Sequence, residues 1–308
     1  MTLLSYSDEP DRRLLGGAIS IGNFDGVHRG HAELLRRLCR LATRLGGPAV
    51  AVTFDPPPAA ILRPESQPPP LTTLGHRAEL LRGFGVDGVV VIRTTRDLLA
   101  ESAENFFASL VVDTLQAKGI VEGPNFFFGR GRAGDPPLLR RLCGEAGIEC
   151  QIVEPTTSDG AWISSTRIRE AILAGEVDSA AAMLSRPYRI AGVVTGGAGR
   201  GRLLGFPTAN LSDIQTLIPA AGVYAGWAAV DGETLPAAIH IGPNPTFAES
   251  LPKVEVHLLD QSRQLYGLNL DVDFVRRIRG IVKFDSAEGL KRQIEVDLGG
   301  VREALGRG

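Results

Sequence analysis

The chain has 308 residues, of which 44% are hydrophobic and 22% are charged, so it can form one or two globular domains with hydrophobic cores. Glycine accounts for 37 residues, well above the usual share of about 7%, but no Gly-x-y period is present. Disorder and a collagen-like fold are therefore excluded, and the excess glycine belongs to turns and loops. The net charge of -2 gives no basic surface for nucleic acid or a membrane.

Three cysteines, Cys39, Cys143 and Cys150, form neither a disulfide framework nor a Cys-x-x-Cys zinc motif. Each lies among apolar residues, so we expect reduced thiols in a cytoplasmic protein. The N-terminal segment lacks the apolar core of a signal peptide, and no apolar run approaches the roughly 18 residues of a membrane helix. We therefore expect no membrane association and no nucleic-acid partner. The sequence does not specify an oligomeric state.

The first half of the chain, residues 1–186, alternates short apolar runs with helical patterns. Helices are clearest over 31–45, where leucines share one stripe, and over 103–118. The alternation predicts an α/β domain with a parallel sheet covered on both faces, and such sheets bind ligands at the carboxyl ends of their strands. The runs that are typical of buried strands are 49–54, 88–92, 119–123 and 148–153.

The second half, residues 187–308, has the pattern of short antiparallel strands. Asp231-Gly232, a dipeptide typical of tight hairpins, separates apolar runs at 223–230 and 234–241. Apolar and polar residues alternate over two later segments, 253–258 and 268–274, as in the half-buried strands of a small barrel or sandwich. A helix is predicted over 286–305. We therefore predict two domains, with the boundary between residues 186 and 187.

The first motif, IGNFDGVHRGH at residues 21–31, follows a predicted strand and opens the first helix. His28 and His31 are three residues apart, so we expect both imidazoles on one face of the first helical turn. Free N–H groups at a helix N-terminus, with two neutral or cationic imidazoles and glycines that allow close approach, suit a nucleotide phosphate in adenylyl transfer. The alternative is a surface turn capped by Asn23 or Asp25. This one loop, directly after a predicted strand, contains two of the five histidines in the chain, which favours a nucleotide site over a plain turn.

The second motif is ISSTRIR at residues 163–169. It places three hydroxyl side chains before a predicted helix and Arg167 and Arg169 in its first turn. Hydroxyls and free N–H groups at such a position can hold the β- and γ-phosphates of a nucleotide, with an arginine neutralising charge. Serine and threonine are also the favoured residues for an ordinary helix cap, so the residues alone leave both interpretations open.

The third motif, GVVTGGAGRGRLLGFPTANL at residues 192–211, combines glycines with two arginines in a loop that can wrap phosphates. It lacks the Gly-Lys-Ser/Thr ending of a Walker loop. Thr208 and Asn210 offer a hydroxyl and an amide oxygen, which are hard ligands that magnesium accepts beside ATP oxygens. A plain glycine-rich hairpin is the alternative, and the adjoining Pro-Thr-Ala-Asn argues against it.

The fourth motif is KVEVHLLD, in which Glu255 lies on the polar face of a predicted strand. A carboxylate at this position can take the proton from a substrate hydroxyl. An isolated glutamate on a strand is more often only solvated. Glu255 alone therefore does not indicate a catalytic site, and its interpretation depends on the other motifs.

In their order along nearly the whole chain, the four motifs resemble those of the bifunctional prokaryotic riboflavin kinase/FMN adenylyltransferase, or FAD synthetase, family. GNFDGVHRGH and ISSTRIR are similar to the nucleotide-binding motifs of the adenylyltransferase module. GRLLGFPTAN and VEVHLLD are similar to motifs of the kinase module. The resemblance implies a nucleotidyltransferase-type, Rossmann-like α/β domain followed by a six-stranded antiparallel barrel with a C-terminal helix.

The resemblance also implies the chemistry. The kinase module would use ATP and Mg²⁺ to convert riboflavin to FMN, with Glu255 as the base and with Thr208 and Asn210 at the metal. The other module would join FMN to the AMP part of a second ATP, giving FAD and pyrophosphate, with His28 and His31 stabilising the transition state. The flavin-binding residues would be Asn125 and Arg279. The nucleotide- or phosphate-binding residues would be Gly22, Asn23, Phe24, Gly30, Ser164, Ser165, Thr166, Arg169, Gly197, Gly201, Arg202 and Gly205.

The sequence departs from the family pattern at several positions. TFDPPP at 53–58 replaces Thr-Phe-Glu-Pro-His-Pro, and GPNFFFG at 123–129 replaces Gly-x-Asp-Phe-Arg-Phe-Gly. In the second half, His240 stands for the asparagine of Asn-Ile-Gly, and Ile281 replaces the acid of Arg-Pro-Glu. The changes in the first half, at Pro57, Asn125 and Phe127, motivate one alternative, a monofunctional riboflavin kinase with an impaired adenylyltransferase domain. A flavin- or nucleotide-sensing binding protein is a further alternative, against which the retained Glu255 argues.

Overall fold

The computed structural model describes residues 2–4, 11–158, 160–196, 201, 205–243, 253–261 and 263–306. The chain divides into two compact units, which we describe separately. The first unit comprises residues 1–68 and 73–164, and the second comprises residues 69–72 and 165–308. By their contacts, helices α7 (Ser165–Ala174) and α8 (Val177–Leu184) belong to the second unit. The domain boundary at 186/187 stays a prediction.

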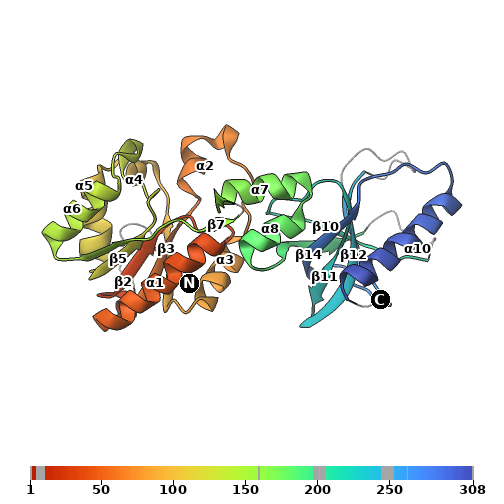
Figure 1. Ribbon diagram of the computed structural model, residues 1–308, viewed down its shortest axis with the longest axis horizontal. Coiled ribbons are helices and arrows are strands. Elements are labelled where there is room, and N and C mark those ends of the chain that lie inside the picture. The colour runs from red at the N-terminus through yellow and green to blue at the C-terminus, as the bar shows by residue number, and fades with distance from the viewer. Residues whose placement is uncertain are drawn as a thin grey trace. The chain divides into compact units, whose positions relative to one another are not determined.

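The first unit is built on a parallel sheet (Figure 1). In the described residues six strands lie in the order β1-β4-β3-β2-β5-β6, and every pairing is parallel. This confirms the predicted α/β class. The edge strand β1 was not predicted, because three residues carry too little periodicity. The strands are β1 (Thr2–Leu4), β2 (Ala18–Ile21), β3 (Ala49–Asp55), β4 (Gly88–Arg93), β5 (Gly119–Glu122) and β6 (Glu149–Ile152).

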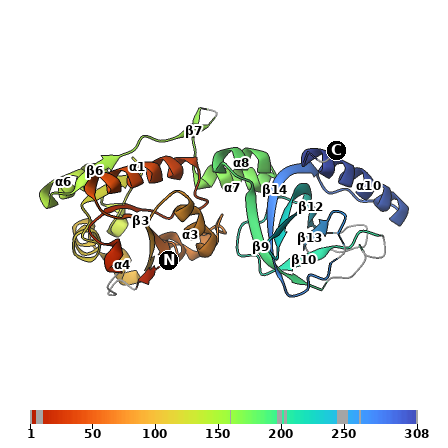
Figure 2. The same cartoon turned by 90° about the horizontal axis from the view of Figure 1, so that it is seen from below.

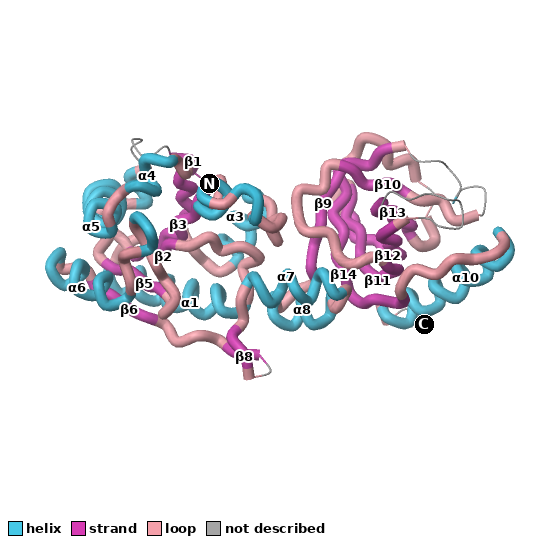
Figure 3. Tube along the Cα trace, turned by 90° about the horizontal axis from the view of Figure 1, so that it is seen from above, coloured by secondary structure: helices cyan, strands magenta, loops and turns pink. Residues whose placement is uncertain are grey.

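Helices cover both faces of this sheet because successive strand residues alternate between the faces (Figure 3). Leucines of α1 and α3 pack on Ala18, Val89 and Val121 on one face. The other face carries Ile19 and Ile120 under α4 to α6. A short hairpin, β7 (Thr157–Ser158) and β8 (Ala161–Trp162), ends the unit. The helices are α1 (Arg29–Leu45), α2 (Pro58–Leu62), α3 (Leu74–Gly83), α4 (Arg96–Ala100), α5 (Ala103–Phe106) and α6 (Pro136–Ala146), with short 3-10 turns at Arg12–Leu14, Pro64–Ser66 and Arg130–Arg132.

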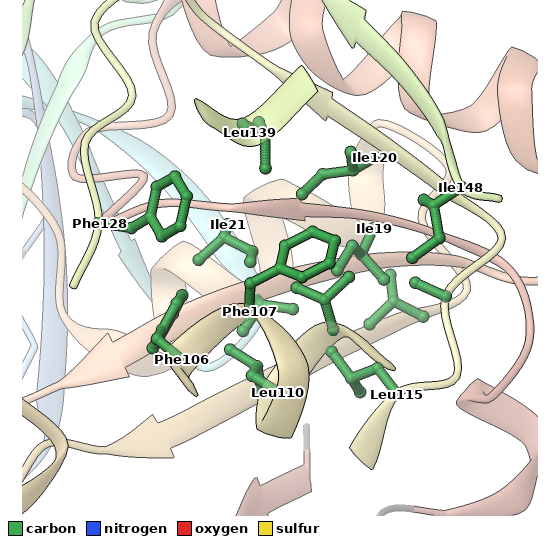
Figure 4. Packing of buried hydrophobic residues seen from close by; sticks show 14 of the residues in the cluster. Ile19, Ile21, Phe106, Phe107, Leu110, Leu115, Ile120, Phe128, Leu139 and Ile148 are labelled. Atoms are coloured by element: carbon green, nitrogen blue, oxygen red, sulfur yellow. The ribbon is translucent and has the colours of Figure 1, made fainter. Parts of the chain in front are cut away.

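The helix predicted over 103–118 differs from the structure. It consists of α5 followed by a π-helical stretch, η3 (Phe107–Thr114), so the helix ends earlier than predicted. The wider turn keeps Phe107 and Leu110 in the core, as Figure 4 shows. Gln116 then takes a positive φ of 49°, which turns the chain toward β5. Sequence periodicity cannot distinguish a π-helix from an α-helix over so few turns.

The second unit contains a closed antiparallel barrel with strand order β10-β13-β12-β11-β14-β9, closed by pairing of β9 with β10. Asp231 and Gly232 both take positive φ in the predicted hairpin between β11 and β12, as a type I′ turn requires. The structure thus confirms a six-stranded barrel. The strands are β9 (Tyr188–Thr195), β10 (Ala209–Ser212), β11 (Gly222–Val230), β12 (Glu233–Gly242), β13 (Lys253–Leu258) and β14 (Asn269–Arg279).

The C-terminal helix α10 (Ala287–Ala304) lies along the outside of the barrel (Figure 2). Its residues Leu298 and Val301 pack on Ala225 of β11 and on Leu259. This confirms the helix predicted over 286–305. Among the described residues, no helix is both long and apolar enough to cross a membrane.

Candidate active sites

The loop between β2 and α1 carries the first motif, and its own apolar residues anchor it. Phe24 and Val27 are buried in the core between α1 and the sheet. Both take positive φ, 47° and 39°, and the Val27 N–H donates to the Phe24 carbonyl at 3.0 Å. Non-glycine residues in this region are strained and persist only where surrounding packing enforces them, as often occurs at functional sites. Phe24, assigned to nucleotide binding from the sequence, therefore acts as an anchor of the loop.

Polar contacts fix the same loop from two further elements. Thr53 of β3, fully buried, donates its hydroxyl to the Asn23 carbonyl at 3.2 Å, while the Asn23 residue itself is exposed. Asp25 and Arg77 of α3 form a buried ion pair at 3.4 Å. The loop is thus held rigidly at the carboxyl end of β2, the edge at which parallel sheets bind ligands.

His28 and His31 meet as the sequence predicts, and they also cap the helix. His28 is the N-cap of α1, and its Nδ1 accepts from the His31 N–H at 3.4 Å. The His31 Nδ1 accepts from the His28 N–H at 3.3 Å, and the two rings stack with centroids 3.7 Å apart. A ring nitrogen that accepts carries no proton, so this capping geometry places the hydrogen of each ring on Nε2.

Glycine at position 30 leaves room for the His28 ring. A Cβ at Gly30 would lie 3.1 Å from Cε1 of His28, closer than ordinary packing allows. At Gly22 an added Cβ would make only an ordinary 3.5 Å contact with the Phe24 ring, so packing alone does not require that glycine. The His-x-Gly-His spacing therefore allows two rings to stack over a helix N-terminus without a side chain between them.

The second motif begins beside the first and then enters the second unit. An added Cβ at Gly30 would lie 3.8 Å from the Ile163 carbonyl, so the start of ISSTRIR lies close to the histidine motif. Ser164 follows, half-buried. The helix starts earlier than predicted, since Ser165 and Thr166 lie within the first turn of α7. Arg169 donates to the Pro69 carbonyl at 3.2 Å. A phosphate-binding role for these residues stays a prediction.

The segment after β5 shares the carboxyl edge of the sheet with the histidine loop, because β5 is the parallel neighbour of β2. Asn125 is exposed in the turn that follows β5, with its Oδ1 folded back toward Gly123. Phe127 is also exposed, and the Arg132 guanidinium lies 4.6 Å from its ring centroid. The buried carboxyl of Glu122, at the end of β5, was missed from the sequence. An acid inside an apolar strand run was the available signal.

In the barrel, strand register aligns the candidate kinase residues. Asn210 pairs with Glu255 of β13, and Glu255 pairs in turn with His240 of β12. Their chain neighbours on either side are buried inside the barrel, so these polar side chains lie on its outer face. The register continues around the barrel as one row of paired residues: Thr195, Asn210, Glu255, His240, Val223 and Arg279.

Glu255 and His240 are partly shielded neighbours in this row. The His240 Nδ1 lies 3.9 Å from Oε2 of Glu255, beyond hydrogen-bond distance, and this nitrogen is buried without a hydrogen-bond partner. Burial lowers the pKa of His240, the positive charge of Arg279 lowers it further, and Asp297 opposes the shift. The imidazole beside Glu255 is therefore neutral at neutral pH.

The third motif reaches the row through the turn before β10. Phe206 donates its N–H to the Gly201 carbonyl at 2.7 Å, and a Cβ at Gly201 would clash with the Phe206 carbonyl at 2.4 Å. Thr208 is half-buried, close to Gly201. Gly205 takes φ of 92°, a backbone conformation that favours glycine. Gly197 and Arg202, assigned to phosphate binding from the sequence, lie outside the described residues.

A cleft of 330 Å³ opens beside the row. Its lining includes Thr195, Asn210 and Lys253, the last at the start of β13. Asp213 also lines this cleft, and Lys253 supplies the positive charge there that suits a phosphate-bearing ligand. Lys253 was not identified from the sequence, because a lysine at a strand end is usually only solvated.

Arg279, expected at the flavin, makes a bidentate ion pair with Asp297 of α10. Its Nε and Nη2 lie 2.9 and 2.7 Å from the carboxylate oxygens, and Gln293 donates to the same carboxylate at 2.9 Å. The Asp297 side chain is 6% exposed. Arg279 therefore connects the end of β14 to α10, and flavin contact by this residue stays a prediction. Among the described residues, no group of three or more His, Cys, Asp or Glu side chains could hold a metal ion.

A parallel-sheet α/β unit with a histidine pair at the N-terminus of its first helix, followed by a barrel that aligns Asn210 with Glu255, is the arrangement expected of a transferase that acts on phosphate groups. Comparison with known proteins agrees. The FAD synthetase family matches residues 12–167, and the riboflavin kinase family matches residues 184–305. The bifunctional riboflavin kinase/FMN adenylyltransferase of Pseudomonas fluorescens is 37% identical over 294 residues, covering 95% of this chain and 94% of the relative. The Escherichia coli K12 protein of the same name is 37% identical over 292 residues, covering 94% and 93%.

The chain belongs to the bifunctional riboflavin kinase/FMN adenylyltransferase family. This confirms the resemblance and the expected enzyme class, with both kinase and nucleotidyltransferase activities in one chain. A crystal structure titled as a macrolide-efflux protein from Streptococcus pneumoniae has the same fold. It matches with a TM-score of 0.88 and 31% identity, covering 98% of this chain and 99% of that chain.

Proposed function

We propose that the barrel unit phosphorylates riboflavin and that the α/β unit adenylylates the resulting FMN, using the residues described above. The observation that carries the kinase assignment is the row that joins Asn210 to Glu255. The observation that carries the second assignment is the stacked pair of His28 and His31 at the N-terminus of α1. The His28–His31 pair lies in the first unit and the row with Glu255 lies in the second, so substitutions at these residues can separate the two activities.

In the kinase step, Glu255 accepts the proton of the terminal ribityl hydroxyl while that oxygen takes the γ-phosphoryl group of ATP. The products are FMN and ADP. Phosphoryl transfer depends mainly on positioning and charge neutralisation, so few reactive side chains are needed. Lys253, in the cleft beside Asn210, supplies a positive charge for the phosphates.

Magnesium fits the donor atoms at the start of β10. The Thr208 hydroxyl and the Asn210 amide oxygen are hard neutral ligands, and Glu255 is paired with Asn210. Magnesium in phosphotransfer sites is held by few protein ligands together with substrate phosphates. When bound, it would neutralise the charge on the ATP phosphates.

In the adenylyl-transfer step, the FMN phosphate attacks the α-phosphorus of a second ATP, and pyrophosphate leaves. The two imidazoles, with hydrogen on Nε2, act as hydrogen-bond donors to the phosphate oxygens as charge develops. The N-terminus of α1 adds free N–H groups and the positive end of the helix dipole. No covalent enzyme intermediate is needed.

Riboflavin, FMN and ATP are therefore the proposed partners, with FMN and FAD as products. Asn125, exposed at the carboxyl edge of the sheet, is a proposed flavin contact. The three cysteines are unbridged, which supports the expected cytoplasmic location.

The test is the flavin product profile of the purified chain with riboflavin, ATP and Mg²⁺. We expect FMN to form first and FAD to follow, and FMN supplied with ATP should give FAD and pyrophosphate. Accumulation of FMN without FAD would support the monofunctional kinase instead. Binding of flavin without either product would support a sensing protein.

A further inference from the structure

The backbone pairing between β2 and β5 ends before either strand ends. Beyond that point, a hydrogen bond to a side chain connects the two strands. The backbone ladder between these strands ends at Ile19 and Ile120. On its other side β2 stays paired with β3 as far as Ile21, and the Gly22 N–H donates to the Val52 carbonyl at 2.9 Å. Successive N–H groups of a strand point to opposite sides, so the Ile21 N–H faces β5. On that side Oε1 of Glu122 accepts a hydrogen bond from the Ile21 N–H, with 2.6 Å between the nitrogen and the oxygen.

This bond occurs where β2 and β5 separate, at the carboxyl end of the sheet, which is the edge at which such sheets bind ligands. The order β3-β2-β5 places the chain connections of β2 and β5 on different sides, which defines the crevice used by ligands in such sheets. The chain runs from Ile21 into the histidine loop, and from Glu122 into the turn that carries Asn125. One hydrogen bond therefore connects the starting points of both segments.

Both partners of the bond are fixed by their surroundings. Glu122 is 2% exposed, and its carbonyl accepts from the Val153 N–H at 2.8 Å. The Ile21 side chain lies in the core cluster near Phe107 and Phe128 (Figure 4). A substitution that removes the acceptor leaves a buried N–H unsatisfied and allows the two strand ends to move apart.

Burial raises the pKa of Glu122 well above its usual range, against the opposing effect of the Ile21 N–H. The other titratable groups that act on it are the thiols of Cys150 on β6 and Cys143 on α6, and neither provides a compensating positive charge. Glutamine matches the shape of this side chain and keeps an oxygen that can accept from the Ile21 N–H, which makes the role of this residue testable.

We propose that Glu122 is a positioning residue for adenylyl transfer, because its hydrogen bond to Ile21 sets the separation between the histidine loop and the Asn125 turn. It acts through these segments and does not contact substrate. The inference rests on the proposed adenylyltransferase function. Displacement of a reacting group by about 1 Å can cost on the order of 100-fold in rate, so loss of this bond is expected to appear in kcat.

The experiment compares Glu122→Gln, Glu122→Asp and Glu122→Leu in the full chain. FAD formation from FMN and ATP gives kcat and KM, and riboflavin phosphorylation by the same preparation is the internal control. We expect Glu122→Gln to stay within about 3-fold of the unmodified chain, whereas the shorter or apolar variants lose on the order of 10- to 100-fold in kcat with kinase activity unchanged.

Two results overturn the proposal. One is unchanged kcat for FAD formation in both Glu122→Asp and Glu122→Leu, even if thermal stability falls, because a purely structural role would give that pattern. The other is a loss in Glu122→Gln as large as in Glu122→Leu. If Glu122→Leu does not fold, the comparison of Asp with Gln decides. Failure of the unmodified chain to make FAD would instead contradict the proposed function.

Discussion

His28 and His31 each accept the other's backbone N–H through Nδ1, with ring centroids 3.7 Å apart. The pair therefore has two structural roles. It caps the first turn of α1, and it fixes both imidazoles in the tautomer that presents Nε2–H as a donor. The helix cap and the proposed catalytic role are therefore combined in the same side chains, and a suitable substitution can separate them.

Asparagine at position 28 can replace the cap but not the imidazole. We expect His28→Asn to keep the stability of the α/β unit while FAD formation falls on the order of 100- to 1,000-fold, the usual effect of removing a transition-state donor. His28→Ala should lose similar activity and also about 1 kcal/mol of stability, because the His31 N–H loses its acceptor. The measurements are FAD production and denaturant unfolding, with riboflavin phosphorylation as the control. Retained FAD formation in His28→Asn would remove His28 from the site.

Glu255→Gln tests the barrel site. Glutamine keeps the shape of the side chain but cannot take the hydroxyl proton, so riboflavin phosphorylation should fall on the order of 100- to 10,000-fold while FMN is still converted to FAD. Glu295→Gln is the matched control, because Glu295 is exposed on α10 and lies outside the row. Equal loss of both activities in a folded Glu255→Gln protein would contradict the independence of the two sites.

Local spacing and periodicity predicted most elements, because such signals lie within a few residues. His28 and His31 were placed together by their i, i+3 spacing, and Glu255 was placed on a polar strand face. The alignment of Glu255 with Asn210 and His240 depends on register between distant strands, which no local pattern encodes. The role of Glu122 likewise depends on where β2 and β5 separate. The π-helix after Phe106 was missed because its backbone hydrogen bonds span only one residue more than those of an α-helix, which local periodicity does not reveal.

His240 predicts a pH-dependent stability of the barrel. Its pKa is lowered in the folded state, first by burial and then by Arg279. Below about pH 6.5, the usual histidine value, the unfolded chain therefore binds a proton that the folded barrel does not. Stability is lost as pH falls through this range. His240→Asn should consequently stabilise the barrel more at pH 5.5 than at pH 8, relative to the unmodified chain. An equal difference at both values, measured by thermal unfolding, would show that His240 titrates normally.

The ion pair between Arg279 and Asp297 is expected to hold α10 on the barrel. Removing one partner of a buried pair leaves an uncompensated charge, so Asp297→Ala should cost on the order of 3 kcal/mol. Asp260→Asn is the control, because Asp260 pairs with Arg302 of the same helix but its side chain is 72% exposed, and the cost should stay below about 1 kcal/mol. Fluorescence of the half-buried Trp227 on β11 follows the barrel during denaturant unfolding. Equal costs for the two variants would mean that the Arg279 pair is no stronger than a surface contact.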